Sequence, residues 1–200
     1  MASPNPAHMD TKLQRDHELL TAAVRDSGAL ALTYFRANPR SWEKGAGDPV
    51  SEADIAVNDL LHEQLHGART EYGWLSEESE DDLIRLDTES IWIVDPIDGT
   101  SAFLDGQAEF TISAALAYRG EPVAAAVFNP ATDEFWDAMR GRGCRLNGNL
   151  VQVTNHPTCS GSRLLMRPLA FQQAHDPEIF RDVETSDPRS IAYRLALVAA

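Results

Sequence analysis

The sequence predicts an α/β protein, specifically an α+β layered sandwich of the αβαβα type in which helices pack on a mainly antiparallel sheet. Three observations lead to this prediction. Apolar residues recur at helical spacing between residues 10 and 66. Short β-branched and apolar runs, separated by tight turns, fill residues 91–139. An apolar helical segment then occupies residues 189–200. Helices before a strand meander indicate layers of helix on sheet.

Composition limits the class of protein. With 43% apolar residues in 200, the chain can bury a core, and no run approaches the length of a membrane span. Acidic residues outnumber basic ones 31 to 17, which argues against nucleic acid polymers and anionic membranes as partners. There is no signal-peptide pattern, and the two cysteines lie in no metal-ligand spacing. We therefore expect a cytoplasmic protein acting on a small molecule, and an anionic substrate would need positive charge from bound metal.

The first helix is predicted over residues 10–35, after a loose Pro-rich tail at residues 1–10. Charged residues occupy the face opposite its apolar positions, and Gly28 suggests a close crossing with a neighbouring element. The apolar positions are Leu13, Leu20, Val24, Leu30 and Tyr34.

A second helix is predicted from Ser51 to about His66, closed by Gly67. Residues 44–49 before it have the composition of a flexible loop. Ser51 and Asp54 have the spacing of a capping box, so capping is the local explanation for Asp54.

Two acidic residues follow a short predicted strand at Trp74-Leu75. Consecutive Glu residues usually form a solvated edge, but Glu77 and Glu78 come directly after a strand end, where site residues collect. The strands predicted after residue 100 are Phe110–Tyr118, Pro122–Phe128, Glu134–Met139 and Ser160–Pro168, with a short helix at Asp176–Val183.

The central motif is Ile91 to Phe103. Ile91–Val94 reads as a buried strand that stops at Asp95-Pro96, and Asp98 follows three residues after Asp95. Gly99 permits close approach of a ligand, and Thr100 opens a predicted helix whose free N–H groups favour an anion. Hard oxygen ligands beside such a helix start suggest a divalent cation bound to a phosphate.

A purely structural interpretation of this motif stays open. Asp-Gly is common turn chemistry, and Asp before a helix is a good N-cap. An EF-hand is excluded because the motif lacks acidic residues at alternate positions.

The final helix begins at Ser190 and ends without a Gly or a basic last turn. A helix that apolar needs a partner, so we expect a chain truncated within a second α/β unit. The domains predicted are residues 11–157, a metal-binding α+β domain, and residues 158–200, an incomplete second one.

Four segments together resemble the inositol monophosphatase superfamily of metal-dependent, lithium-sensitive phosphatases. They are Lys44-Gly45 to Asp54, Ser76-Glu77-Glu78-Ser79, Trp92 to Thr100, and the helix from Ser190 to Ala199. The resemblance implies a small phosphorylated metabolite as substrate, and it is compatible with a homodimer.

The resemblance also implies a role for each matching residue. The ligands of two or more Mg²⁺ ions would be Glu77, Asp95, Ile97 through its carbonyl, and Asp98. Glu77, Asp54 and Thr100 would orient and deprotonate the attacking water. The N–H groups of Gly99 and Thr100 would hold the phosphate, and supporting groups would be Glu78, Lys44 and Asp48.

Ser76, Glu109-Phe110-Thr111 and Arg194 resemble the CysQ-type 3'(2'),5'-bisphosphate nucleotidases. They favour removal of the 3'-phosphate of adenosine 3',5'-bisphosphate. The alternative is an inositol-1-monophosphatase or related polyol phosphatase. A further metal-binding Asp, expected in a Trp-Asp pair after the final helix, is missing, and Trp136-Asp137 comes too early for that role. A catalytically inactive metal-binding domain is therefore the alternative from another class.

Overall fold

The computed structural model describes residues 6–45, 47–155, 158–165 and 182–199. Its centre is a seven-stranded sheet in the order β3-β4-β5-β6-β7-β8-β9. β3 pairs parallel with β4, and every later neighbour is antiparallel. The strands are β3 (Gly73–Ser76), β4 (Ser90–Asp98), β5 (Thr111–Tyr118), β6 (Glu121–Asn129), β7 (Glu134–Met139), β8 (Gly143–Leu146) and β9 (Asn149–Val151).

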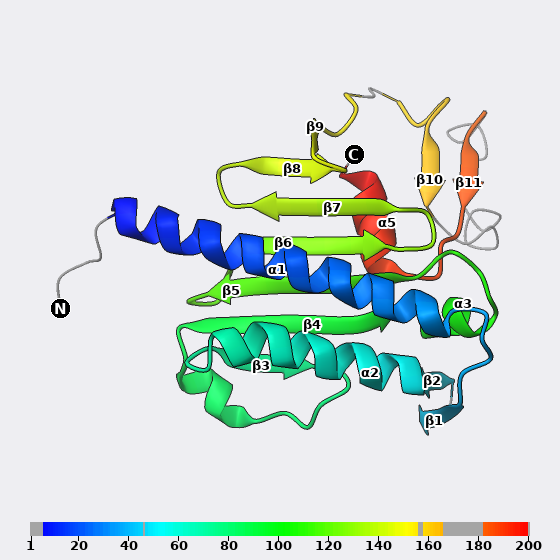
Figure 1. Cartoon of the computed structure of the whole chain (residues 1–200). Coiled ribbons are helices and arrows are strands. Elements are labelled where there is room, and N and C mark those ends of the chain that lie inside the picture. The colour runs from blue at the N-terminus through cyan, green and yellow to red at the C-terminus, as the bar shows by residue number, and fades with distance from the viewer. Residues whose placement is uncertain (1–5, 46, 156–157, 166–181, 200) are drawn as a thin grey trace.

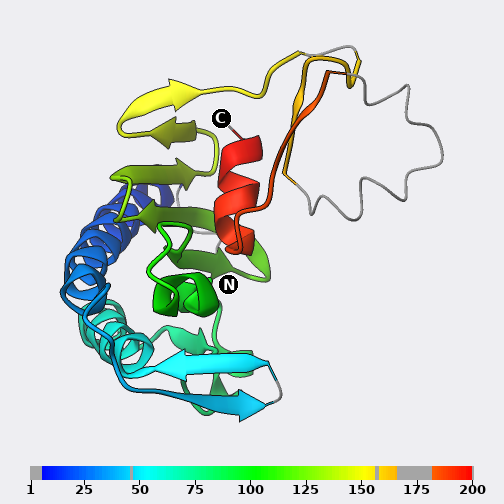
Figure 2. The same ribbon diagram turned by 90° about the vertical axis from the view of Figure 1, so that its right-hand side faces the viewer.

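Helices cover both faces of this sheet. The helix α1 (Pro6–Tyr34) and the helix α2 (Glu52–Leu61), continued by the π-helical η1 (His62–His66), lie on one face. The short α3 (Thr100–Leu104) and α5 (Ile191–Val198) lie on the other side, as Figure 2 shows. The sheet between them buries its core side chains against α1 and α2, with Trp92 and Phe135 almost fully enclosed. The predicted layering of helices on a mainly antiparallel sheet is confirmed.

Gly28 marks a close crossing, as predicted. A Cβ atom added there would lie 2.3 Å from Cε1 of Phe128 on β6. No side chain fits at that distance, so α1 approaches the sheet closely only because residue 28 is glycine.

The strand β4 is longer than predicted. It continues past Asp95 to Asp98, although the sequence indicated a stop at Asp95-Pro96. Its pairing with β5 is regular up to Asp95 and shifts before Asp98. Pro96 cannot donate a ladder hydrogen bond, so it is tolerated at this irregularity and the strand resumes after it.

Two local predictions near the N-terminus are wrong. Residues 6–10 belong to α1, so the predicted tail can include only residues 1–5, which lie outside the described part. Residues 44–49 are not simply a loop, because β1 (Ser41–Gly45) and β2 (Asp48–Ser51) form an antiparallel hairpin there. The second helix does run to His66, but Gly67 keeps right-handed helical dihedrals and does not cap it with a left-handed turn.

The last part of the chain begins with β10 (Arg163–Leu165), which pairs parallel with β11 (Glu184–Ser186). The predicted strand at Ser160–Pro168 is thus shorter, with residues 166–168 outside the described part. The predicted helix at Asp176–Val183 lies outside it as far as residue 181. The helix α5 is confirmed and packs Tyr193 and Ala196 against Trp136 of β7. No helix in the described ranges is long and apolar enough to cross a membrane.

Candidate active site

The predicted site residues come from several segments that meet at one end of the sheet. The arrowhead of β4, the start of α3 and the junction of β2 with α2 lie together there (Figure 1). Because β3 runs parallel to β4, the loop that follows β3 emerges at the same end. The lower end of α5, where that helix starts, completes the group in Figure 2.

Asp54 serves two partners with its two oxygens. Its Oδ2 accepts hydrogen bonds from the backbone N (2.8 Å) and Oγ (2.6 Å) of Ser51, which completes the predicted capping box. Its Oδ1 lies 2.9 Å from Oγ1 of Thr100 on α3. The carboxyl is fully buried, and burial raises its pKa against the lowering effect of these hydrogen bonds. One oxygen of Asp54 therefore serves the cap of α2, and the other is bonded to Thr100.

The Thr100 hydroxyl stands between two acceptors. Besides Asp54 it lies 2.9 Å from the carbonyl oxygen of Ile97, and its single proton can go to one of them at a time. A lone pair of the hydroxyl remains free to accept. Such a hydroxyl can take a hydrogen bond from a water while it donates to the carboxylate.

Asp95 is a buried carboxyl that repels its neighbours. Its Oδ1 is inaccessible and has no hydrogen-bond partner among the described residues. Burial, followed by the charges of Glu77, Asp98 and Asp54, raises the pKa of Asp95 to about 8. Those repulsions indicate that the four carboxyls, which come from α2, the loop after β3 and the strand β4, lie near one another. A shared cation would relieve them.

Glu77 and its neighbour Glu78 differ in exposure and in their partners. Burial and the nearby Glu78 charge raise the pKa of Glu77, whose side chain still reaches solvent. Glu78 is 3% exposed and pairs with Lys44, whose Nζ lies 2.5 Å from its Oε2. Lys44 also donates to the backbone carbonyl of Glu77 at 3.0 Å. Lys44 thus ties the hairpin to this loop, whereas the third predicted supporting residue, Asp48, is exposed at the start of β2.

Asp98 anchors the start of α5. Its Oδ2 accepts from Oγ of Ser190 at 2.6 Å and from the backbone N of Ala192 at 2.5 Å. Sequence reasoning assigned Ser190 only as a helix cap, a role it also fills by accepting from the N–H of Tyr193. One carboxylate oxygen of Asp98 is therefore committed to α5.

Gly99 is required by its backbone. Its φ of +95° lies in the left-handed region, and a Cβ there would be 2.9 Å from the carbonyl oxygen of Glu109. The tight turn that presents the N–H groups of residues 99 and 100 depends on this glycine.

Sequence reasoning missed a polar network behind the Glu77-Glu78 loop. Oγ of Ser76 donates to Oδ1 of Asn58 at 2.7 Å and accepts from the N–H of Glu78 at 3.2 Å. Asn58 also donates to Ser79 at 3.2 Å. The sequence feature that could have identified Asn58 is its spacing, because it follows Asp54 by one helical turn and therefore lies on the same face of α2.

Trp136-Asp137 lies away from these carboxyls. Asp137 faces α1, with Oδ2 3.1 Å from Nε2 of His17, while Trp136 packs on Tyr193. Asp137 thus links β7 to α1.

The donor set suits a hard divalent cation such as Mg²⁺, because it consists of carboxylates and one carbonyl oxygen. Its fit rests on the unpartnered buried Oδ1 and raised pKa of Asp95. Across the described ranges, no three His, Cys, Asp or Glu side chains already form a finished cage. Glu77 is exposed, and one oxygen of Asp98 is already bonded to the start of α5.

Comparison with known proteins points to one family. The model of the Inositol monophosphatase family matches residues 12–200. An inositol-1-monophosphatase of Rhizobium meliloti (strain 1021) is 48% identical over 110 residues, covering 55% of this chain and 41% of the relative. A Nus factor SuhB of Xylella fastidiosa is 33% identical over 148 residues, or 73% of this chain and 53% of the relative.

A solved structure of the extragenic suppressor protein SuhB from Bartonella henselae superposes with a TM-score of 0.80 at 28% identity, covering 93% of this chain and 74% of that one. The chain thus spans about half the length of the curated relatives it matches. With the family model matched over almost the whole chain, and the same fold in a solved relative, this chain belongs to the inositol monophosphatase family.

Proposed function

We propose that this chain carries the metal- and phosphate-binding half of a Mg²⁺-dependent phosphomonoesterase. The single observation that supports this most is the convergence of Asp54, Glu77, Asp95 and Asp98 on one end of the sheet, with the charge of three of them raising the pKa of Asp95. Burying several carboxyls together destabilises a fold unless a cation compensates them. The family is metal-dependent, which fits that chemistry.

The proposed ligands are Glu77, Asp95, the carbonyl of Ile97 and Asp98, for two or more Mg²⁺ ions. When bound, the ions would neutralise the phosphate and lower the pKa of a coordinated water. Asp95 would hold the metal through Oδ1, which is inaccessible and has no hydrogen-bond partner in the part of the chain that the structure describes. Asp98 would contribute Oδ1, since its Oδ2 already accepts from Ser190 and Ala192.

Proton transfer is assigned to the pair of Asp54 and Thr100, assisted by Glu77. Burial raises the pKa of Asp54, which makes its carboxylate a stronger base than an exposed one. With Thr100 donating to Oδ1 of Asp54, the hydroxyl oxygen would accept a hydrogen bond from an attacking water and so orient it. As the water gives that proton to the Thr100 oxygen, the original hydroxyl proton of Thr100 would pass to Oδ1 of Asp54. The phosphate would bind to the N–H groups of Gly99 and Thr100.

The proposed substrate is inositol monophosphate or a related polyol phosphate. Two relatives from different bacteria carry the name inositol-1-monophosphatase, at 48% and 42% identity. The residues that favoured a bisphosphate nucleotidase have internal partners in this fold. Ser76 bonds Asn58, Thr111 bonds Ser190, and Arg194 pairs with Asp187 and the carbonyl of Pro188. Adenosine 3',5'-bisphosphate is therefore the comparison substrate.

Two measurements test the proposal. Titration calorimetry with Mg²⁺ should give binding to the chain, and Asp95→Asn should abolish it. Phosphate release from inositol 1-phosphate should depend on Mg²⁺ and exceed release from adenosine 3',5'-bisphosphate. Full Mg²⁺-dependent turnover by the Asp95→Asn variant would contradict the assigned role. Mg²⁺ binding with no turnover on either substrate would instead support the non-catalytic metal-binding domain.

A further inference from the structure

A second cluster of metal-ligating side chains lies at the other end of the second helix. His62 and His66 are four residues apart in η1, and their imidazole rings stack with centroids 4.7 Å apart and planes 15° apart. His62 is exposed and His66 is half-buried, so solvent reaches the pair. We propose that His62 and His66 bind a transition-metal ion of the Cu²⁺, Ni²⁺ or Zn²⁺ class, at a site separate from the carboxylate cluster.

The two rings are close enough to share one ion. Imidazole nitrogens bind such ions at about 2.0–2.1 Å, along a lone pair that lies in the plane of the ring. The stacked rings, with centroids 4.7 Å apart, must therefore rotate so that one nitrogen of each faces the ion, and neither the exposed His62 nor the half-buried His66 is enclosed. Burial, followed by the nearby His66, lowers the pKa of His62, which favours the neutral imidazole that metals need.

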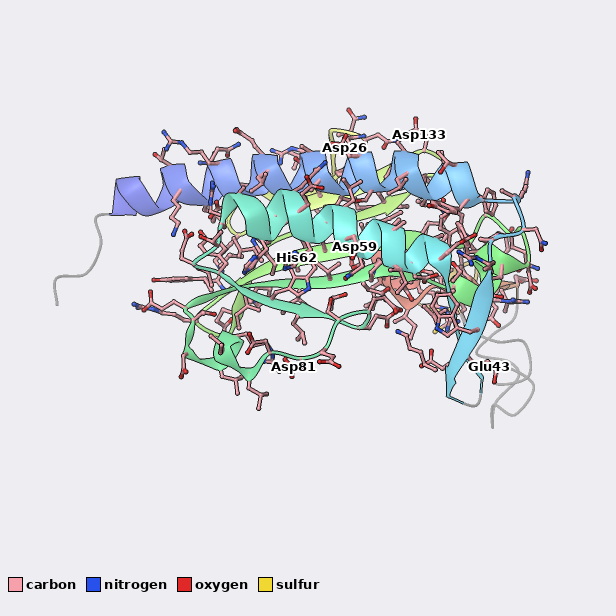
Figure 3. All side chains as sticks on the ribbon, turned by 60° about the horizontal axis from the view of Figure 1, so that its bottom comes forward. Asp26, Glu43, Asp59, His62, Asp81 and Asp133 are labelled. Carbon is pink, nitrogen blue, oxygen red and sulfur yellow. The ribbon has the colours of Figure 1, made fainter. Side chains whose placement is uncertain are left out.

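The local backbone is also unusual. The helix changes from α to π geometry over His62–His66, and single π turns within α-helices occur frequently at functional sites. Asp59, one turn earlier on α2, adds negative charge near His62, as Figure 3 shows with both residues labelled. Residues 62–66 have the H-E-x-x-H spacing seen in zinc enzymes. With two imidazoles as protein ligands, water would fill the other positions, and we infer binding alone.

The site differs from the carboxylate cluster in position and in metal preference. His62 follows Asp54 by eight residues, or about 12 Å along a helix. Imidazoles prefer Cu²⁺, Ni²⁺ and Zn²⁺, whereas carboxylates suit Mg²⁺. The expected order of affinity is Cu²⁺ above Ni²⁺ and Zn²⁺, with no competition from Mg²⁺.

The fluorescence of Trp74 can report metal binding at His62. The ring of Trp74 meets that of His62 edge to face at a centroid distance of 4.9 Å. A paramagnetic Cu²⁺ ion held by His62 should therefore quench Trp74 fluorescence. The titration uses Cu²⁺, and then Ni²⁺, with saturating Mg²⁺ present to occupy the carboxylates. Trp74→Phe should lose most of the quenching while calorimetry still detects Cu²⁺ binding.

The variants His62→Gln and His66→Gln each leave one imidazole, and each should weaken Cu²⁺ binding about 100-fold because the second attachment is lost. Glu63→Gln is the matched control, since it changes an exposed charge in the same turn and keeps both imidazoles. Its affinity should equal that of the unaltered chain. Quenching that survives in both histidine variants, or that is absent from the unaltered chain, would overturn the proposal. Far-UV circular dichroism of each single variant checks that the helix is retained.

Discussion

Asp95→Asn should stabilise the metal-free protein at neutral pH. The pKa of the Asp95 carboxyl rises from its ordinary 3.8 to about 8 in the folded chain, because it is buried beside Glu77, Asp98 and Asp54. Below pH 3.8 the carboxyl is protonated in both states and costs nothing. As the pH rises from 3.8 to 8, the unfolded chain releases this proton while the folded chain keeps it, so the folded state becomes relatively less stable.

The size of the effect follows from that interval. At 1.36 kcal/mol per pH unit, the cost at pH 7 is about 4 kcal/mol. Glu77 can bind a proton in place of Asp95, and this reduces the repulsion between the two carboxyls. We therefore expect Asp95→Asn to raise the free energy of unfolding by about 2 kcal/mol. For a chain of this size that is about 4–8 °C in melting temperature.

The assay is thermal and urea unfolding with a chelator present, followed by tryptophan fluorescence at pH 4, 7 and 8.5. The gain should be largest at pH 7 and above and should fall toward zero at pH 4. Saturating Mg²⁺ should stabilise the unaltered protein and leave Asp95→Asn unchanged, so that their order reverses.

Asp98→Asn is the matched control and should move in the opposite direction. It keeps the shape of the side chain but weakens the charged hydrogen bonds to Ser190 and Ala192. Because the variant also removes one of the charges that repel Asp95, the expected net loss is at most about 1 kcal/mol. A metal-free Asp95→Asn variant that is no more stable than the unaltered protein at pH 7, or whose gain is the same at pH 4, would refute the reasoning.

Three further predictions concern single contacts. Thr100→Val should reduce Mg²⁺-dependent phosphate release about 100-fold while Thr100→Ser retains it, because only the hydroxyl can link Asp54 to a water; equal rates for both would exclude that role. Gly28→Ala should cost about 1–3 kcal/mol in urea unfolding, since its Cβ would lie 2.3 Å from Phe128; unchanged stability would mean that α1 moves freely on the sheet. Ser51→Ala should cost about 1 kcal/mol by removing the cap of α2, and Ser51→Asn should recover most of it in the same assay.

Local sequence patterns were sufficient to predict many of the helices and strands. Helical spacing identified α1 and α2, tight turns separated β5, β6 and β7, and Ser190 marked the start of α5. The errors occurred where pairing across the sheet overrides local preference. Residues 44 and 45 read as a loop but join β1, and β4 continues through Pro96 because β5 pairs with it on both sides of an irregularity.

The amino-acid sequence by itself determined which residues are candidates for the site. Carboxylates at Asp95 and Asp98, a glycine at position 99 and acidic residues after a strand are all local patterns, and they indicated carboxyls that the fold brings near one another. Only the tertiary structure decided how each oxygen is used. Asp98 gives one oxygen to α5, a helix that starts more than ninety residues later, and the oxygen of Asp54 that the local capping box leaves over accepts from Thr100. Such assignments depend on contacts between distant segments, because a carboxylate's partners and the burial that raises its pKa exist only when those segments pack together.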